Sequence, residues 1–232
     1  MLFKRVLLKL SGETFASANY SIAQDAVLRT ANEIKVATEN ENLEIAVVVG
    51  AGNIWRGAGK FVERVAADKI GMMSTVVNSL VLSEALNSIG VRSEVFCANG
   101  VSGFVQNFDS KKVVNCIENK VLAVLGGGTG NPFFTTDTAA ALRAAEINAG
   151  IILKATQVDG IYSADPKKDS KAMKFETLKF HEILDKNLKI MDIEAFSLCQ
   201  KYGIRICVFD FYKNGNLKKI LCGEKIGTIV EG

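Results

Sequence analysis

Histidine and proline are scarce in this sequence of 232 residues, which contains one histidine and two prolines. A single histidine leaves little room for a metal site built from several histidines or for a Ser–His–Asp triad, so many hydrolase mechanisms are excluded. Charge of one sign is not in excess either, because 28 lysines and arginines face 25 aspartates and glutamates, a net charge of +3. This balance argues against a nucleic-acid-binding surface, but it suits a small anionic ligand.

Paired cysteine motifs and long apolar runs are missing as well. The five cysteines include no C-x-x-C pair, so we expect reduced thiols and neither disulfides nor a zinc site. The apolar N-terminus is interrupted by Lys4, Arg5 and Lys9, which predicts a strand rather than a signal peptide. No run approaches the roughly 18 apolar residues of a membrane span. We therefore expect a cytoplasmic protein that binds neither membranes nor nucleic acid.

Short apolar segments alternate with longer segments of helical periodicity. Strands are predicted at residues 6–8, 45–49, 93–96, 121–125, 151–153 and 205–209, and helices at residues 21–38, 68–89, 138–148 and 192–202. Ser21 and Gln24 form a capping-box pattern for the first helix, and Thr136 with Asp137 is expected to cap the third. Strands that are apolar on both faces and separated by helices indicate a parallel sheet covered on both sides. We expect a single α/β domain over residues 1–232.

Glycine is abundant, with 20 residues, and it gathers in loops that directly follow three predicted strands, at residues 9–13, 50–59 and 126–137. In an open α/β sheet ligands bind at the carboxyl ends of the strands, so the three loops should meet at one crevice. Glycine exposes consecutive N–H groups that can bind phosphate, and the third loop runs into a helix N-terminus, which also favours an anion. Unrelated tight turns are the alternative, but they would not explain the Lys, Arg or Thr within reach of each loop.

The common nucleotide-binding motifs do not occur in these loops. The Walker pattern G-x-x-x-x-G-K-[ST] fails because Ala58 stands in the lysine position, and no segment satisfies G-x-G-x-x-G. A Walker NTPase and a dinucleotide-dependent oxidoreductase are therefore disfavoured. What remains is a phosphate-binding fold with a loop pattern of its own.

Charged side chains at the loops are suited to phosphoryl transfer, which needs mainly positioning and charge compensation. Lys9 precedes the turn at Ser11 and Gly12 and could neutralise a transferring phosphoryl group; the alternative is a lysine in solvent at a strand end. Arg56 suits a bidentate grip on phosphate. Asp137 could orient a lysine, or it could simply cap its helix.

Residues 154–166 combine an amine, hydroxyl groups, carboxylates and an aromatic ring in one segment. An adenine could stack on Tyr162, with the polar groups of Thr156 and Asp165 around it. The alternative is a plain hairpin with one turn at residues 159–160 and a second at residues 165–166, and both interpretations can hold together.

The sequence closely resembles the bacterial uridylate kinases of the amino-acid kinase superfamily over essentially its whole length. The most specific match is G-T-G-N-P-F-F-T-T-D at residues 128–137. Further matches lie at residues 8–13, 50–59, 153–156, 158–160, 164–166 and 223–228.

This resemblance implies a three-layer αβα sandwich with a mainly parallel central sheet, and transfer of the ATP γ-phosphate to UMP with Mg²⁺ accompanying ATP. The implied catalytic residues are Lys9, Asp137 and, as a second lysine, Lys154. The implied ATP site comprises Lys9, Leu10, Ser11, Gly12, Gly52, Arg56, Thr156, Tyr162 and Asp165. The implied UMP site comprises Ala51, Asp68, Thr129, Gly130, Asn131, Pro132, Phe133, Phe134, Thr135 and Thr136, with Asp68 at the ribose hydroxyls. No protein ligand to a metal is implied.

The resemblance also implies an allosterically regulated homohexamer. Apolar positions in residues 72–86 are a candidate interface, although packing within one subunit would explain them too. Residues 15–20 lack the glycine-rich pattern that the family links to activation by GTP, so this sequence puts such activation in doubt.

Other departures from the family pattern lie near the implied UMP site. Ala51 replaces a glycine and keeps its N–H, so binding survives unless that position needs a positive φ. Lys69 replaces the histidine that usually follows the aspartate, and the segment between Arg56 and Asp68 is shorter than usual.

Two other functions stay open. One is a kinase of the same superfamily that acts on a carboxylate or carbamate, which the N-P-F-F-T-T segment at residues 131–136 disfavours. The other is a non-catalytic nucleotide- or oxyanion-binding protein, which the presence of both Lys9 and Asp137 disfavours.

Overall fold

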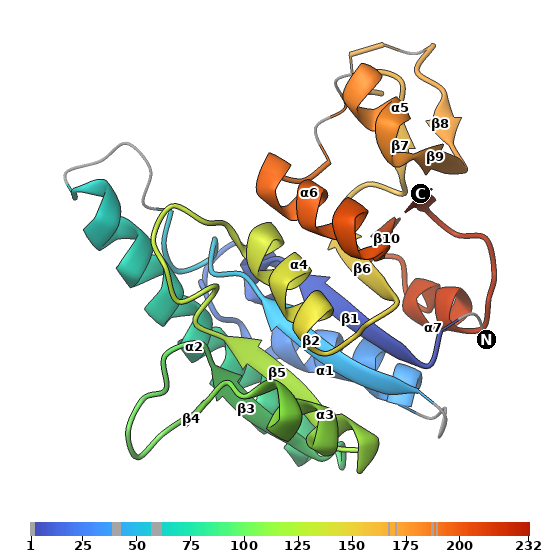
Figure 1. Cartoon of the computed structure of the whole chain (residues 1–232). Helices are drawn as coiled ribbons and strands as arrows, with labels where there is room; N and C mark the ends of the chain where they lie inside the picture. The colour runs from blue at the N-terminus through green and yellow to red at the C-terminus, as the bar shows by residue number, and fades with distance from the viewer. Residues whose placement is uncertain are drawn as a thin grey trace.

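A mainly parallel nine-stranded sheet forms the centre of the computed structural model (Figure 1). The structure describes residues 3–38, 43–56, 62–166, 168–169, 171–186, 188 and 190–232. The strand order is β4-β3-β5-β2-β1-β6-β10-β11-β9, and β11 is antiparallel to β10. The strands are β1 (Arg5–Leu10), β2 (Glu44–Val49), β3 (Ser93–Cys97), β4 (Gln106–Asn107), β5 (Leu122–Gly126), β6 (Ile151–Thr156), β9 (Thr177–Lys179), β10 (Arg205–Asp210) and β11 (Thr228–Glu231).

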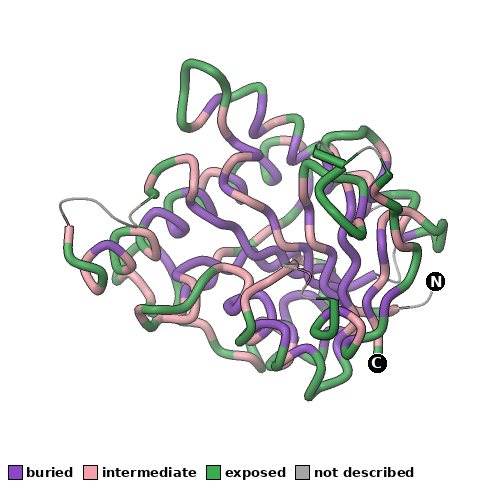
Figure 2. The backbone as a smooth tube through the Cα atoms, turned by 90° about the horizontal axis from the view of Figure 1, so that it is seen from above, coloured by how far each residue is buried: buried purple, intermediate pink, exposed green. Residues whose placement is uncertain are grey.

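Helices cover both faces of this sheet. One layer comprises α1 (Gln24–Thr38), α2 (Arg64–Ser88) and α7 (Asn216–Leu221), and the other comprises α3 (Ser110–Glu118), α4 (Thr136–Glu146) and α6 (Ile193–Tyr202). Successive side chains of a strand point to opposite faces, so Leu8 packs with the first layer and Leu7 with the second. Buried backbone accordingly runs through the middle of the molecule (Figure 2). The predicted three-layer α/β sandwich is confirmed, and the single domain over residues 1–232 stays a prediction.

The helix starts differ from the prediction in three places. Helix α2 begins at Arg64, four residues before the predicted start at Asp68. The N-cap of α4 is Thr135 and not the predicted Thr136 with Asp137, because the Thr135 hydroxyl accepts from Asp137 N and Thr138 N in the first turn of the helix. The Ser21–Gln24 pattern is not a capping box, since Gln24 is itself the first residue of α1.

The prediction also missed several short elements. A 3₁₀ helix, η1 (Gly12–Phe15), follows β1, and the charged segment after residue 165 contains β8 (Lys174–Phe175), β9 and α5 (Phe180–Asp185). Strand β7 (Ile161–Tyr162) pairs antiparallel with β8. The turn at residues 165–166 therefore lies inside the hairpin formed by β7 and β8. The hairpin turn predicted at residues 159–160 is wrong, because these residues join β6 to β7, which belong to different sheets.

Helix α2 corrects the expectation that no segment is apolar enough for a membrane span, because by length and composition it passes that test. Its Leu82 and Leu86 are fully buried in the core beneath the sheet, which accounts for part of its apolar character. Four other apolar side chains of α2 are exposed: Ile70, Met73, Val77 and Leu80. All five cysteines are free, as predicted.

Candidate active site

The first two glycine loops are in close contact at the carboxyl ends of β1 and β2. A Cβ on Gly12 would collide with Asn53 Oδ1 and would lie 2.9 Å from both Gly50 O and Gly52 N. A Cβ on Gly50 would lie 3.6 Å from Thr136 Oγ1, at the start of α4. The predicted meeting of the three loops is confirmed for these residues; the remainder of the second loop, residues 57–59, lies outside the described residues.

A buried asparagine that the sequence analysis missed supports the second loop. The side chain of Asn78, on α2, is fully buried and its amide donates to Gly50 O and to Asn53 Oδ1, both at 2.8 Å. A polar amide at a core-facing position of an apolar helix was the available signal, since a buried amide needs partners.

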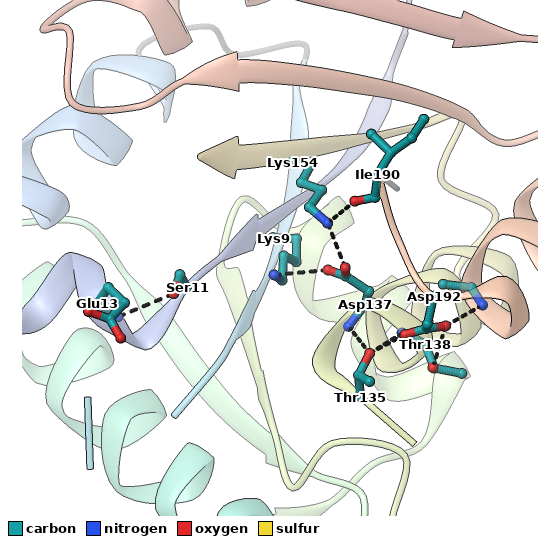
Figure 3. Close-up of polar contacts among 10 residues, drawn as sticks. Lys9, Ser11, Glu13, Thr135, Asp137, Thr138, Lys154, Ile190 and Asp192 are labelled. Carbon is teal, nitrogen blue, oxygen red and sulfur yellow. Dashed lines mark hydrogen bonds and ion pairs between the residues drawn. The ribbon is translucent and has the colours of Figure 1, made fainter. Parts of the chain in front are cut away.

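Asp137 lies between two lysines (Figure 3). Lys9 Nζ is 2.9 Å from Asp137 Oδ1, and Lys154 Nζ is 2.5 Å from Asp137 Oδ2. Lys9 and Lys154 are partners in the parallel register of β1 and β6, so both side chains leave the same face of the sheet, toward α4. This geometry agrees with the prediction that Asp137 organises the catalytic lysines. It also supports Lys154 as the second catalytic lysine.

The three charges lie in a mostly desolvated site, where the exposed fraction is 16% for the Asp137 side chain and 12% for each lysine. Burial alone would raise the pKa of Asp137, but the two ammonium groups outweigh it and hold that pKa below its ordinary value. Burial lowers the pKa of Lys154, Lys9 acts in the same direction, and the carboxylates of Asp137 and Asp192 offset part of the effect. Asp137 is therefore ionised at neutral pH.

Arg56 bridges the first and second loops. Its guanidinium forms an ion pair with Glu13 of η1, and its Nε donates to Gly52 O at 2.9 Å. The Arg56 side chain is largely exposed, so its remaining N–H groups face outward beside the glycine loops. This position agrees with the predicted role at the phosphates, but Glu13 was not anticipated as its partner.

The predicted acceptor residues Asp68 and Phe133 contact each other. Asp68 Oδ2 accepts from Phe133 N at 2.8 Å and from Arg64 Nε at 2.7 Å. Phe133 has a φ of +74°, which is uncommon for a residue other than glycine, and its hydrogen bond to Asp68 stabilises that conformation. Ala51 is not among the described non-glycine residues with positive φ, so the alanine there is tolerated by the backbone.

The rest of the third loop presents its groups to the surface. Thr129 Oγ1 accepts from Asn131 N at 3.1 Å, and the side chain of Asn99 donates to Gly130 O at 3.2 Å. The Phe133 and Phe134 rings are both exposed. Pro132 is partly buried beside them, while Thr135 and Thr136 lead into α4.

The three residues predicted at the nucleoside of ATP lie on β6 and on the β7–β8 hairpin. The Thr156 hydroxyl contacts Phe209 O at 3.0 Å, and Tyr162 donates to Asp159 Oδ1 at 2.7 Å. Asp165 is 4.0 Å from Lys168 Nζ. These contacts stabilise the segment itself, so an arrangement around an adenine stays a prediction.

Comparison with known proteins agrees with this architecture. The family model "Amino acid kinase family" matches residues 4–210. A uridylate kinase of Bacteroides thetaiotaomicron is 44% identical over 232 residues, covering 98% of this chain and 98% of that protein. The crystal structure of UMP kinase from Bacillus anthracis superposes with a TM-score of 0.95 at 34% identity, over 99% of this chain and 96% of that one. The UMP kinase of Ureaplasma parvum superposes with a TM-score of 0.93 at 34% identity, with both chains fully covered. The fold, the paired lysines and these relatives together place the chain in the amino acid kinase family, among its uridylate kinases.

Proposed function

We propose that this protein transfers the γ-phosphate of ATP to UMP and forms UDP, a step of pyrimidine nucleotide synthesis in the cytoplasm. The observation that carries the proposal is the buried carboxylate of Asp137 between Lys9 and Lys154, at the edge of the sheet where the glycine loops after β1 and β2 meet. Phosphoryl transfer requires little else from a protein than positioning and charge compensation.

The two lysines neutralise the charge that develops on the transferring phosphoryl group. Lys9 reaches it from β1 and Lys154 from β6, and the N–H groups around Gly12 and Gly52 bind the phosphates from the other side. Asp137 holds the lysines and does not act as a base, because each of its oxygens already contacts an ammonium group. No base is needed, since the second pKa of a phosphate monoester is about 6 and the attacking oxygen of UMP is largely ionised at neutral pH.

The two substrates would lie on opposite sides of this centre. On the ATP side we place Leu10, Ser11, Arg56, Thr156, Tyr162 and Asp165. On the UMP side we place Ala51, Asp68 and residues 129–136. Oδ1 of Asp68 suits a ribose hydroxyl, because Oδ2 already accepts from Arg64 and Phe133.

Magnesium would enter with ATP as part of the substrate. The described residues include no group of three or more His, Cys, Asp or Glu side chains that could hold a metal ion, and Asp137 is engaged by lysines. Mg²⁺ is commonly bound through nucleotide phosphates and waters, so ATP itself can supply the ligands.

We further propose that the protein assembles as a homohexamer in which α2 provides a contact surface. Ile70, Met73, Val77 and Leu80 are exposed on α2 at spacings of three and four residues, which places them on one face of the helix. Val77→Lys should lower the molar mass measured by light scattering. Met173→Lys, at an exposed methionine elsewhere, is the control and should leave the mass unchanged; an unaltered mass for Val77→Lys would contradict this surface.

A coupled assay of UDP formation with a panel of nucleoside monophosphates tests the proposed activity. We expect kcat/KM for UMP to exceed that for CMP by roughly 10⁴-fold, because a site built to hydrogen-bond one base edge rejects the other. Comparable values for the two nucleotides would contradict it. Hydroxylamine distinguishes the alternative kinase, since it traps an acyl phosphate but not UDP, and ATP binding without turnover on any acceptor would indicate the non-catalytic alternative.

A further inference from the structure

Asp192 is the N-cap of α6, but its carboxylate also reaches the first turn of α4 (Figure 3). Oδ1 accepts from Ala195 N at 2.7 Å and from Thr138 Oγ1 at 2.9 Å. Oδ2 accepts from the hydroxyl of Thr135. One side chain therefore binds the N-terminal turns of two helices.

The contact with Thr135 fixes the direction of a hydroxyl group that caps α4. Thr135 Oγ1 donates its proton to Asp192 and accepts from Asp137 N at 3.0 Å and from Thr138 N at 3.3 Å. The residue whose N–H is held in this way is Asp137. The orientation of the cap thus determines where the Asp137 carboxylate enters the site.

The backbone just before Asp192 contacts the same centre from the other side. Lys154 Nζ donates to Ile190 O at 2.5 Å, in addition to its contact with Asp137. These contacts form a closed ring that passes through Asp137, Lys154, residues 190–192 and Thr135. A shift of residues 190–192 would move the lysine and the carboxylate together.

We propose that Asp192 is a positioning residue for phosphoryl transfer, which holds the first turn of α4 through Thr135 and Thr138 so that Asp137 stays between Lys9 and Lys154. This inference rests on the proposed function. The simpler explanation is that Asp192 only caps α6. Helix α3 provides a matched example of an aspartate with that role alone. Its N-cap Asp109 accepts from Lys112 N at 2.9 Å, and α3 packs on β5 and β2.

The test compares Asp192→Asn with Asp109→Asn. Asparagine caps helices about as well as aspartate, so both variants keep the capping oxygen. At position 192, however, the amide cannot accept all three of the present donors, because one of its two ends is itself a donor. We expect Asp192→Asn to lower kcat roughly tenfold or more, since small misplacements of reacting groups can cost up to about 100-fold. Asp109→Asn should stay within about twofold of the wild type.

A second readout does not depend on turnover. The groups facing Lys154 are Asp137 on α4, Lys9 on β1 and Asp192 before α6, so removing the charge of Asp192 should lower the pKa of Lys154. NMR titration of ¹³C-labelled lysine, with Lys154 assigned from Lys154→Arg, measures this. Asp109→Asn removes the charge of a helix cap that is not among the groups acting on Lys154, so it should leave this titration unchanged.

Thr138 supplies variants for the case that Asp192→Asn does not fold. Thr138→Val removes the hydroxyl at nearly constant volume and should lower kcat, whereas Thr138→Ser keeps the hydroxyl and should restore most of it. The proposal is overturned if Asp192→Asn keeps wild-type kcat, whether or not the Lys154 titration shifts, or if Asp109→Asn loses as much activity. A wild-type protein that forms no UDP would instead contradict the proposed function, and the Lys154 titration would still test the arrangement.

Discussion

Glu13 and Arg56 form an ion pair that joins the loop after β1 to the loop after β2. An anion that binds Arg56 through the same N–H groups must displace the Glu13 carboxylate. Because exposed ion pairs contribute only about 0–1 kcal/mol, the displacement is inexpensive. We therefore predict that Glu13→Gln lowers the KM for ATP by about two- to fivefold. Initial rates at varied ATP check this, and an increased KM would show that Glu13 orients Arg56 rather than competing with phosphate.

Lys9→Ala should fold normally and lose most of its turnover. Removing one group that stabilises transition-state charge costs about 10²–10³-fold in kcat, and Lys9 is one of two such groups here. Lys4→Ala is the matched control, because Lys4 is exposed near the opposite end of β1 and pairs with Glu44. Steady-state kinetics measures the loss of kcat, and circular dichroism checks that both variants fold. A kcat near the wild-type value in Lys9→Ala would refute the role of Lys9.

As pH rises, kcat should begin to fall at a lower pH than it would if it depended on a lysine of ordinary pKa. Lys154 must be protonated to stabilise phosphoryl charge, and its pKa lies below the ordinary 10.5 because burial favours the neutral amine, an effect that Lys9 adds to and that Asp137 and Asp192 only partly offset. Its proton is therefore lost earlier as pH rises. A kcat–pH profile measures this limb, and Lys154→Arg should move it to higher pH, since a guanidinium stays charged. An alkaline limb at the same pH in both proteins would assign the titration to another group.

Gly12→Ala should destabilise the protein and weaken ATP binding. The added Cβ meets backbone atoms of the second loop 2.9 Å away, and such overpacking costs about 1–3 kcal/mol. Gly71→Ala is the contrasting variant. Among the described residues its Cβ would meet only Trp55 Cδ1, at an ordinary contact distance of 3.7 Å, and alanine stabilises a helix by about 0.5–1 kcal/mol relative to glycine. Urea unfolding of both variants checks the opposite signs; equal stabilities would mean that the loops separate without cost.

One thiol per chain should react rapidly in the native protein. Cys222 is exposed, whereas Cys97, Cys116, Cys199 and Cys207 are buried. Burial raises the pKa of Cys116, Cys199 and Cys207 to about 12, so their reactive thiolates are nearly absent at neutral pH. Titration with a chromogenic disulfide reagent should count one thiol before denaturation and five after it. Two or more fast thiols would show that the core opens locally.

The sheet and its loops were predictable because their signals are local. Apolar strands such as residues 45–49 and glycines directly after them mark both the fold and the edge where ligands bind. The placement of Lys9 opposite Lys154 was not predictable from spacing, because it depends on which strands are neighbours and in which register they pair. The cap at Thr135 was missed for a similar reason, since Asp137 is an equally good N-cap by residue type. Asp192 acts through partners far away in the sequence, and no local pattern marks it. The partners of Asn78 are also distant, and its one signal was a polar amide among the apolar residues of its helix.

The parallel register of β1 and β6 makes turnover a measure of correct folding. Side chains alternate between the two faces of a strand, so a slip of one residue would carry Lys154 to the face of the sheet covered by α1 and α7. Such a chain could remain compact and keep most of its secondary structure, yet Asp137 would meet only one lysine. Specific activity per folded molecule would therefore reveal mispaired molecules in a refolded sample that circular dichroism would count as native.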